Sequence, residues 1–138
     1  MILVDTSVLI DFLKGQDNPS VQGLLQIIDR DIPFGISPII FLEILQGAAT
    51  ESDFKLLKEY LGSQVFYDLK DRRESYARAA KMSAELRRKG MAIKSSIDCL
   101  IAQTAIDNDL YLLHNDSDFD RIKKVAPLKT WEKKLPGR

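Results

Sequence analysis

The hydrophobic residues of this chain gather in short stretches, separated by longer ones in which they recur every three or four positions. Residues 1–4 form a continuous apolar run, which predicts a strand buried on both faces of a sheet. Further strands are predicted at residues 32–36, 65–69, 111–114 and 128–131, short stretches that also hold a polar, charged, Pro or Gly residue. The longer stretches have the period of helices with one buried face. Strands that alternate with helices predict a parallel sheet with right-handed crossovers. We therefore expect an α/β fold with three layers, in which a central parallel sheet of four or five strands is flanked by helices.

Capping residues divide the helical stretches into separate helices. Thr6 or Ser7 is the expected N-terminal cap of the first helix, and Asn18 is the expected cap of the second. Ser37 and Thr50 are in position to cap the next two. The helices that follow are expected at residues 71–89, 97–108 and 118–124.

The helix expected at residues 71–89 is amphipathic, with a basic outer face. Its inward face is predicted to hold Tyr76, Ala79, Ala80, Ser83 and Leu86. Gly90 closes this helix. Ser96 is the predicted cap of the next helix, which carries Asp98 in its first turn.

The composition fits one domain that spans residues 1–138. Hydrophobic residues make up 45% of the chain and charged residues 29%, which is enough to build a single core. Lys and Arg number 20, as do Asp and Glu, so the formal net charge is zero. Binding to nucleic acid would therefore depend on local basic patches.

Cysteine usage and hydropathy bear on location. Cys99 is the only cysteine, so an internal disulfide is excluded and a reducing compartment is expected. No secretory signal begins the sequence, and Glu43 interrupts the strongest apolar run, at residues 36–45. A membrane span needs about 20 apolar residues. We expect a cytoplasmic protein without a membrane partner.

Four acidic residues are distinguished by where they fall. Asp5 follows the first predicted strand, Asp116 follows the fourth, Asp98 begins a helix, and Glu43 lies within an apolar helix. Ligands of open α/β sheets bind at the carboxyl ends of the strands. Carboxylates about 4 Å apart repel by roughly 4 kcal/mol at an effective dielectric near 20, so a converged cluster needs a cation or protons. Oxygen ligands suit Mg²⁺ or Mn²⁺, and the lack of a His and Cys constellation argues against zinc.

Each acid also has an ordinary structural interpretation. Asp5 and Asp98 would suit helix N-termini, and Asp116 would suit a turn. Glu43 is harder to explain in this way, because a Glu among large apolar residues is costly to bury without a partner. A calcium loop beginning at Asp116 is rejected, because Arg121 stands where such a loop requires Gly.

Four segments together resemble PIN-domain ribonucleases of the VapC toxin type, over nearly the whole chain. They are VDTSVLID at residues 4–11, SPIIFLEIL at 37–45, SIDCLIAQTA at 96–105 and LLHNDSDFDRI at 112–122. The resemblance implies a PIN-like fold. It maps the family's acids onto Asp5, Glu43, Asp98 and Asp116, with Asp118 as an accessory acid and Ser7, Ser37 and Asn115 as polar support. His114 falls where Thr or Ser is commoner, and we interpret it as a packing residue at the end of a strand.

The resemblance also implies a function. It predicts a metal-dependent endoribonuclease, the toxin of a toxin-antitoxin pair, that cleaves RNA such as tRNA or rRNA by attack of water on a phosphodiester. Mg²⁺ or Mn²⁺ would be bound by Asp5, Asp98 and Asp116. Glu43 would complete the site directly, through a water, or as a general base. The implied partners are a small cognate antitoxin, operator DNA through that antitoxin, and a second copy of the chain in a homodimer.

Two alternatives remain open from the sequence. One is a noncatalytic PIN-like module that binds RNA or a protein, and the other is an RNA-processing PIN nuclease without an antitoxin. The basic residues expected to guide an RNA backbone are Arg87, Arg88, Lys89 and Lys94. The apolar residues expected to dock an antitoxin are Leu24, Leu25, Phe54 and Leu57.

Overall fold

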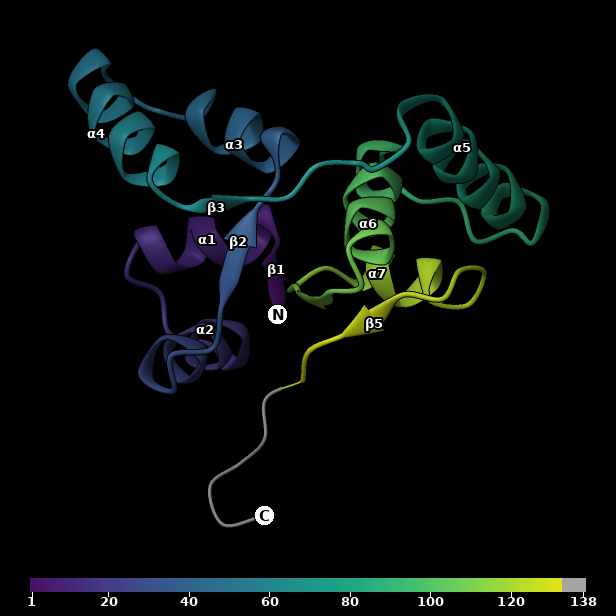
Figure 1. Cartoon of the computed structure of the whole chain (residues 1–138), viewed down its shortest axis with the longest axis horizontal. Coiled ribbons are helices and arrows are strands. Elements are labelled where there is room, and N and C mark those ends of the chain that lie inside the picture. Colours follow the sequence, from purple (N-terminus) through teal and green to yellow (C-terminus); the bar gives the residue numbers. More distant parts are fainter. Residues whose placement is uncertain (133–138) are drawn as a thin grey trace, which may run out of the picture.

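A five-stranded parallel sheet forms the centre of the protein, with the strand order β3-β2-β1-β4-β5 (Figure 1). The structure is a computed structural model and describes residues 1–132. The strands are β1 (Ile2–Val4), β2 (Phe34–Ile36), β3 (Val65–Phe66), β4 (Tyr111–Leu113) and β5 (Lys129–Thr130). All neighbouring pairs are parallel. The predicted α/β class with a parallel sheet flanked by helices is confirmed.

Seven helices connect and cover the strands within the described residues. They are α1 (Thr6–Leu13), α2 (Pro19–Asp29), α3 (Pro38–Leu45), α4 (Glu51–Gly62), α5 (Arg72–Arg88), α6 (Ile97–Asp107) and α7 (Ser117–Ile122). As predicted, the side chains of Asn18, Ser37 and Thr50 accept hydrogen bonds at the starts of α2, α3 and α4. Across residues 1–132, none of these helices has the length and apolar character needed to cross a bilayer.

Two predicted caps are wrong. The cap of α1 is Asp5, whose carboxylate accepts a hydrogen bond from the backbone of Ser7, so neither Thr6 nor Ser7 has this role. At α6 the side chain of Ser96 makes no capping hydrogen bond. The hydroxyl of Ser95 instead accepts from the backbone N–H of Ile97 at 3.1 Å. Ser, Thr and Asp all cap helices well, so adjacent candidates cannot be ranked by residue type alone.

The buried face of α5 also differs from the prediction. Ala79 and Leu86 are buried as expected, but Tyr76 is 53% exposed. Ser75 and Met82 take the remaining inward positions. The hydroxyl of Ser75 donates to Oδ2 of Asp107 in α6 at 2.6 Å, which fixes the rotation of α5. The third strand is shorter than residues 65–69, because the ladder ends soon after Phe66.

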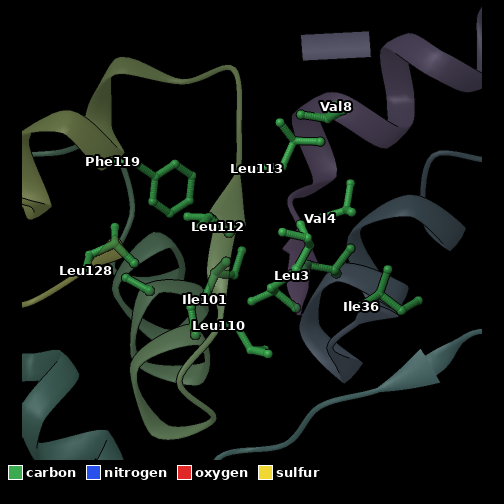
Figure 2. Packing of buried hydrophobic residues seen from close by; sticks show 14 of the residues in the cluster. Leu3, Val4, Val8, Ile36, Ile101, Leu110, Leu112, Leu113, Phe119 and Leu128 are labelled. Carbon is green, nitrogen blue, oxygen red and sulfur yellow. The ribbon is translucent and has the colours of Figure 1, made fainter. Parts of the chain in front are cut away.

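The central strand β1 is buried along its whole length and β4 beside it from Leu112 onward, whereas the edge strands β3 and β5 are partly exposed. Successive residues of a strand point to opposite faces, and Leu112 and Leu113 of β4 are both buried. Figure 2 shows Leu112 on the side of Ile101 and Phe119, and Leu113 on the side of Val8. Helices therefore cover both faces, and polar chemistry is confined to the ends of the strands.

The chain reverses its direction of travel across the sheet between β1 and β4. From β1 it proceeds outward to β2 and β3, and later strands are added on the other side, beginning with β4. The backbone N–H of Asp5 donates to the carbonyl of Leu113 at 2.9 Å, which aligns the carboxyl ends of these two strands. In open α/β sheets a reversal of this kind creates the crevice in which ligands bind.

Candidate metal centre

Asp5 lies at the end of β1 and is 4% exposed. Its Oδ2 accepts hydrogen bonds from the hydroxyl of Ser7 at 2.6 Å and from the Ser7 backbone at 3.2 Å. Burial raises the pKa of Asp5 from 3.8 to about 6, against the lowering effect of the Ser7 hydrogen bonds and with a contribution from the charge of Glu43. The fold thus holds a buried carboxylate in a fixed orientation.

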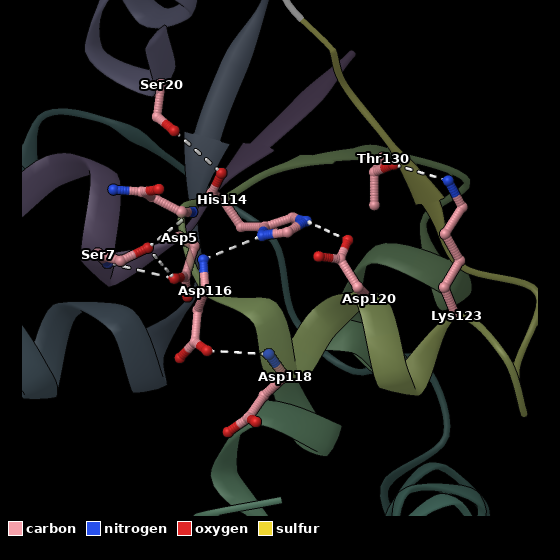
Figure 3. Close-up of polar contacts among 10 residues, drawn as sticks. Asp5, Ser7, Ser20, His114, Asp116, Asp118, Asp120, Lys123 and Thr130 are labelled. Carbon is pink, nitrogen blue, oxygen red and sulfur yellow. Dashed lines mark hydrogen bonds and ion pairs between the residues drawn. The ribbon is translucent and has the colours of Figure 1, made fainter. Parts of the chain in front are cut away.

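Ser7 connects this acid to the end of β4. While its hydroxyl donates to Asp5, the same oxygen accepts from the backbone N–H of Asn115 at 3.1 Å. Asp116 follows, and its Oδ1 caps α7 by accepting from the backbone of Asp118 at 2.9 Å (Figure 3). The ends of β1 and β4 are therefore joined by a single hydroxyl placed between the two acids.

Three carboxylates come together at this edge of the sheet. Asp98, Asp116 and Asp118 each offer an oxygen, and these oxygens lie within 4.8 Å of one another. Asp98, which α6 supplies from its first turn, has its pKa raised from 3.8 to about 7. Burial is the main cause, and the charges of the neighbouring acids add to it: Asp5, Asp116, Asp118 and Glu43. A cluster of this kind is favourable only with a cation or with bound protons.

The three-acid group includes Asp118, which the sequence placed only as an accessory. Asp118 is 1% exposed, and both of its oxygens have protein donors. Oδ1 accepts from Nη1 of Arg121 at 2.7 Å, and Oδ2 accepts from the backbone N–H of Lys94 at 3.2 Å. Arg121 therefore neutralises part of the acidic charge, and Asp118 ties the loop before α6 to α7.

Glu43 extends from α3 toward the start of α1. Its Oε1 accepts a hydrogen bond from the hydroxyl of Thr6 at 2.7 Å. Glu43 is half-buried, and the Thr6 hydroxyl gives one of its carboxylate oxygens a donor within this apolar helix. Ser37 lies at the other end of α3, where its hydroxyl accepts from the backbone of Ile40 at 3.3 Å. From the sequence Thr6 is expected only as a helix cap, and its contact with Glu43, 37 positions away, has no local sequence signal.

Basic residues lie at different distances from the acids. Lys94 is close to them through its backbone contact with Asp118. Arg87 and Arg88 are exposed in the last turn of α5, and Lys89 follows as the residue that ends this helix. Of these candidates for RNA contact, Lys94 is the one that the fold attaches directly to the acidic cluster.

The site residues have the chemistry of a centre for a hard cation. They supply carboxylate and hydroxyl oxygens, the ligand type preferred by Mg²⁺ and Mn²⁺. Burial raises the pKa of Asp98 most, and the charges of Asp5, Asp116, Asp118 and Glu43 raise it further. Asp98, Asp116 and Asp118 could therefore hold a metal ion.

Comparison with known proteins finds similar proteins over nearly the whole chain. Ribonuclease VapC11 of Mycobacterium tuberculosis is 27% identical over 130 residues, which cover 94% of this chain and 96% of that protein. Among solved structures, VapBC2 of Rickettsia felis, bound to a DNA fragment from its promoter, has a TM-score of 0.71 at 24% identity, and the match covers 96% of this chain and all of that one. FitAcB of Neisseria gonorrhoeae has a TM-score of 0.68 at 22% identity, covering 96% of this chain and 97% of that one.

The family assignment comes from a profile that spans most of the sequence. The profile of the PIN domain matches residues 2–125, which include all five acids described above. The resemblance to PIN-domain proteins of the VapC type is thereby confirmed. This chain belongs to the PIN-domain family.

Proposed function

We propose that this protein is a metal-dependent endoribonuclease that acts as the toxin of a VapBC-type toxin-antitoxin pair. The observation that carries the proposal is the acidic cluster at the carboxyl ends of β1 and β4, where oxygens of Asp98, Asp116 and Asp118 lie within 4.8 Å of one another and where burial, with the charges of four other acids, raises the pKa of Asp98. The relatives with 27% identity are named as VapC ribonucleases, which supports the same activity here. A noncatalytic binding module would have no need to concentrate these charges.

Mg²⁺ or Mn²⁺ is the proposed cofactor, bound by Asp5, Asp98 and Asp116. When bound, such an ion polarises the scissile phosphate and makes water a better nucleophile near neutral pH. Asp118 is the acid least suited to be a primary ligand, because Arg121 and the Lys94 backbone already donate to it. We assign it to holding the loop before α6 against the site.

Two hydroxyl groups of the chain hold acidic side chains in position for the reaction. Ser7 fixes the Asp5 carboxylate and the end of β4, and Thr6 fixes Glu43. Glu43 either completes the ligand set, directly or through a water, or accepts a proton from the attacking water. That water forms the new bond to phosphorus as the bond to the 3′ oxygen breaks, so the products carry a 5′-phosphate and a 3′-hydroxyl.

The RNA backbone is proposed to approach past the loop before α6. Lys94 lies in this loop, next to the acids. Arg87, Arg88 and Lys89 extend the positive charge from the end of α5. Cations at these positions would neutralise phosphates on either side of the cleaved bond without reading the base sequence. The substrates proposed are structured RNAs, with tRNA and rRNA as the first to test.

A small antitoxin is the proposed protein partner. An apolar groove of about 600 Å³ lies between α1, α3 and α4, and its lining includes Leu13, Leu56, Leu57 and, at the site, Glu43. An apolar segment would bind through a few anchors in this groove, and a basic side chain on it would reach the acids. The solved neighbours are toxin-antitoxin complexes, three of them with DNA, which supports an antitoxin that also contacts operator DNA.

One predicted docking residue is wrong, Leu57 and Phe54 stay predictions, and Leu25 is not part of the groove proposed here. Leu24 is 1% exposed and belongs to the core, so it is not available to a partner. Leu57 lines the groove, whereas Leu25, 49% exposed, lies on α2 and outside its lining. Phe54 is 39% exposed at the start of α4. A homodimer remains part of the proposal, and light scattering on the purified protein at micromolar concentration tests it.

The test of the activity uses purified protein and total RNA. Wild type with Mg²⁺ or Mn²⁺ is expected to generate discrete new 5′-phosphate ends, and EDTA is expected to abolish them. Asp5→Asn, Asp98→Asn and Asp116→Asn should each remove cleavage while leaving the circular dichroism spectrum unchanged. Asp120→Asn is the matched control, because Asp120 is an exposed acid on the same short helix.

Three outcomes of this test would overturn parts of the proposal. Cleavage by folded Asp98→Asn, or cleavage in EDTA, would refute the metal-dependent mechanism. RNA binding without cleavage by wild type would favour the noncatalytic module. Cleavage without an inhibitor encoded by a neighbouring reading frame would favour an RNA-processing nuclease.

A further inference from the structure

His114 is held rigidly at the end of β4, two positions before Asp116. Its side chain is only 12% exposed. The imidazole ring lies 5.0 Å from the ring of Phe119, centroid to centroid, and Phe119 is fully buried. The carbonyl of His114 accepts a hydrogen bond from the hydroxyl of Ser20 at 3.2 Å, which fixes the strand end to α2 (Figure 3).

The ring makes its polar contact with the backbone of Asp116. The N–H of Asp116 donates to Nδ1 of His114 at 3.2 Å. An imidazole nitrogen can accept a hydrogen bond only when it carries no proton, so the ring proton is placed on Nε2. Nε2 faces Oδ1 of Asp120 at 3.9 Å, which is too long for a hydrogen bond. The close contact is thus the one to Asp116.

The hydrogen bond to Nδ1 of His114 restrains the backbone at the start of the turn that carries Asp116. The amide of Asp116 is oriented by His114, and its carboxylate is oriented by the backbone of Asp118. The two hydrogen bonds fix the residue on both sides, with the strand end before it and α7 after it. An Asp116 without the first contact would keep its helix cap but lose the restraint on its backbone.

We propose that His114 is a positioning residue, whose Nδ1 fixes the backbone of Asp116 and thereby places the Asp116 carboxylate opposite Asp98. This inference rests on the proposed function, since it gives a purpose to the arrangement of the acids. It replaces the earlier interpretation of His114 as a packing residue only. Groups that orient metal ligands in this way commonly change metal affinity by about 10- to 100-fold when they are removed.

Two substitutions distinguish the effect of the Nδ1 acceptor of His114 from the effect of its aromatic ring. His114→Asn keeps an acceptor atom one bond from Cγ, as Nδ1 is, and removes the ring that contacts Phe119. His114→Phe keeps an aromatic ring against Phe119 and removes the acceptor. Mn²⁺ affinity, measured by isothermal titration calorimetry, is expected to fall about tenfold or more in His114→Phe and to be largely restored in His114→Asn. Cleavage rates should follow the same order.

The opposite order of Mn²⁺ affinities in the two variants would overturn the inference. If His114→Phe binds Mn²⁺ as wild type does while His114→Asn loses affinity, the ring acts by packing against Phe119. Equal affinities in all three proteins would also refute positioning. Thermal denaturation of each variant shows whether a loss of affinity reflects unfolding.

A metal-free measurement tests the same contact independently. His114 is the only histidine in the chain, so the ¹⁵N signals of the imidazole in untagged protein are unambiguous. We expect the tautomer with the proton on Nε2, and slow hydrogen exchange of the Asp116 amide in wild type and His114→Asn but not in His114→Phe. A proton on Nδ1, or equal exchange in the three proteins, would refute the contact. Failure of wild type to bind Mn²⁺ would instead overturn the proposed function, whichever tautomer is found.

Discussion

Thr6 and Glu43 lie 37 positions apart in the sequence, yet the Thr6 hydroxyl donates to Oε1 of Glu43 at 2.7 Å. The bond joins the start of α1 to the middle of α3. It gives the one acid that arises from an apolar helix a fixed orientation toward Asp5, whose pKa the charge of Glu43 helps to raise. Glu43 is therefore part of the same electrostatic cluster as the acids at the strand ends.

The Thr6 contact predicts a specific effect on catalysis. Thr6→Val removes the donor with almost no change in shape, and we expect kcat to fall about tenfold because Glu43 is no longer oriented. Thr6→Ser keeps the hydroxyl and should retain most of the activity. Single-turnover cleavage of a defined RNA measures the difference, and thermal denaturation checks the fold. Equal rates for the Val and Ser variants would mean that Glu43 does not depend on Thr6.

The pH dependence of stability follows from the raised pKa values. A carboxyl with a higher pKa in the folded protein binds more protons there than in the unfolded chain, so the free energy of unfolding falls as pH rises between the two values. That interval runs from 3.8 to about 7 for Asp98 and from 3.8 to about 6 for Asp5. We expect the metal-free protein to lose stability from about pH 4 to about pH 7, as measured by urea unfolding in EDTA.

The contribution of Asp98 can be isolated from this profile. Asp98→Asn should flatten the decline, and Mn²⁺ should restabilise wild type at pH 7 but not the variant. Comparison with the variant is needed because burial lowers the pKa of His114, an effect that makes stability rise with pH over a nearby range. Identical pH profiles for the two proteins would contradict the electrostatic account of the cluster.

The positions of the strands and helices were predicted more accurately from the sequence than the face of a helix that is buried. All five strands were located, and the signal was clearest at β1, because a strand buried on both faces leaves a continuous apolar run. The face of α5 was mispredicted, since Ala and Ser are compatible with either side of a helix. Its rotation is set by the bond between Ser75 and Asp107, a contact across 32 positions that no local pattern contains.

In the site, too, the positions of residues were easier to predict than the contacts of their side chains. Asp5, Asp98 and Asp116 fall at strand ends or a helix start and Glu43 falls within an apolar helix, and these positions, together with family resemblance, indicated which acids form the site. The pairing of Asp118 with Arg121 and the Nδ1 contact of His114 were not foreseen. Both depend on side-chain geometry within one short turn, where residue types permit several hydrogen-bond patterns.

A glycine in β2 tests the packing of the sheet edge. A Cβ on Gly35 would collide with the carbonyl oxygen of Val65 in β3 and with the ring of Tyr67, so backbone would have to move. We expect Gly35→Ala to reduce the free energy of unfolding by about 1–3 kcal/mol, as overpacked sites do. Gly62→Ala is the control, because no atom lies within 4 Å of its Cβ position. Urea unfolding should find this control neutral or slightly stabilised, and similar losses for both variants would contradict the predicted collision.

The last prediction concerns the groove between α1, α3 and α4, and it tests whether the antitoxin docks there or on α2. Leu56 on α4 lines the groove and is 65% exposed, so Leu56→Glu should spare the fold while adding a charge where an apolar anchor would bind. Such a change is expected to weaken association by about 2–4 kcal/mol. Leu25→Glu is the matched control, because Leu25 is a similarly exposed Leu on α2 outside the groove lining.

Coexpression with the product of a small neighbouring reading frame allows this comparison. Growth, copurification and RNA cleavage are measured for wild type and both variants. Leu56→Glu should escape inhibition while still cleaving RNA, and Leu25→Glu should remain inhibited, because only the first changes the surface that continues to Glu43. Escape by Leu25→Glu alone would move the docking surface to α2, and retained binding by both folded variants would exclude the groove between α1, α3 and α4.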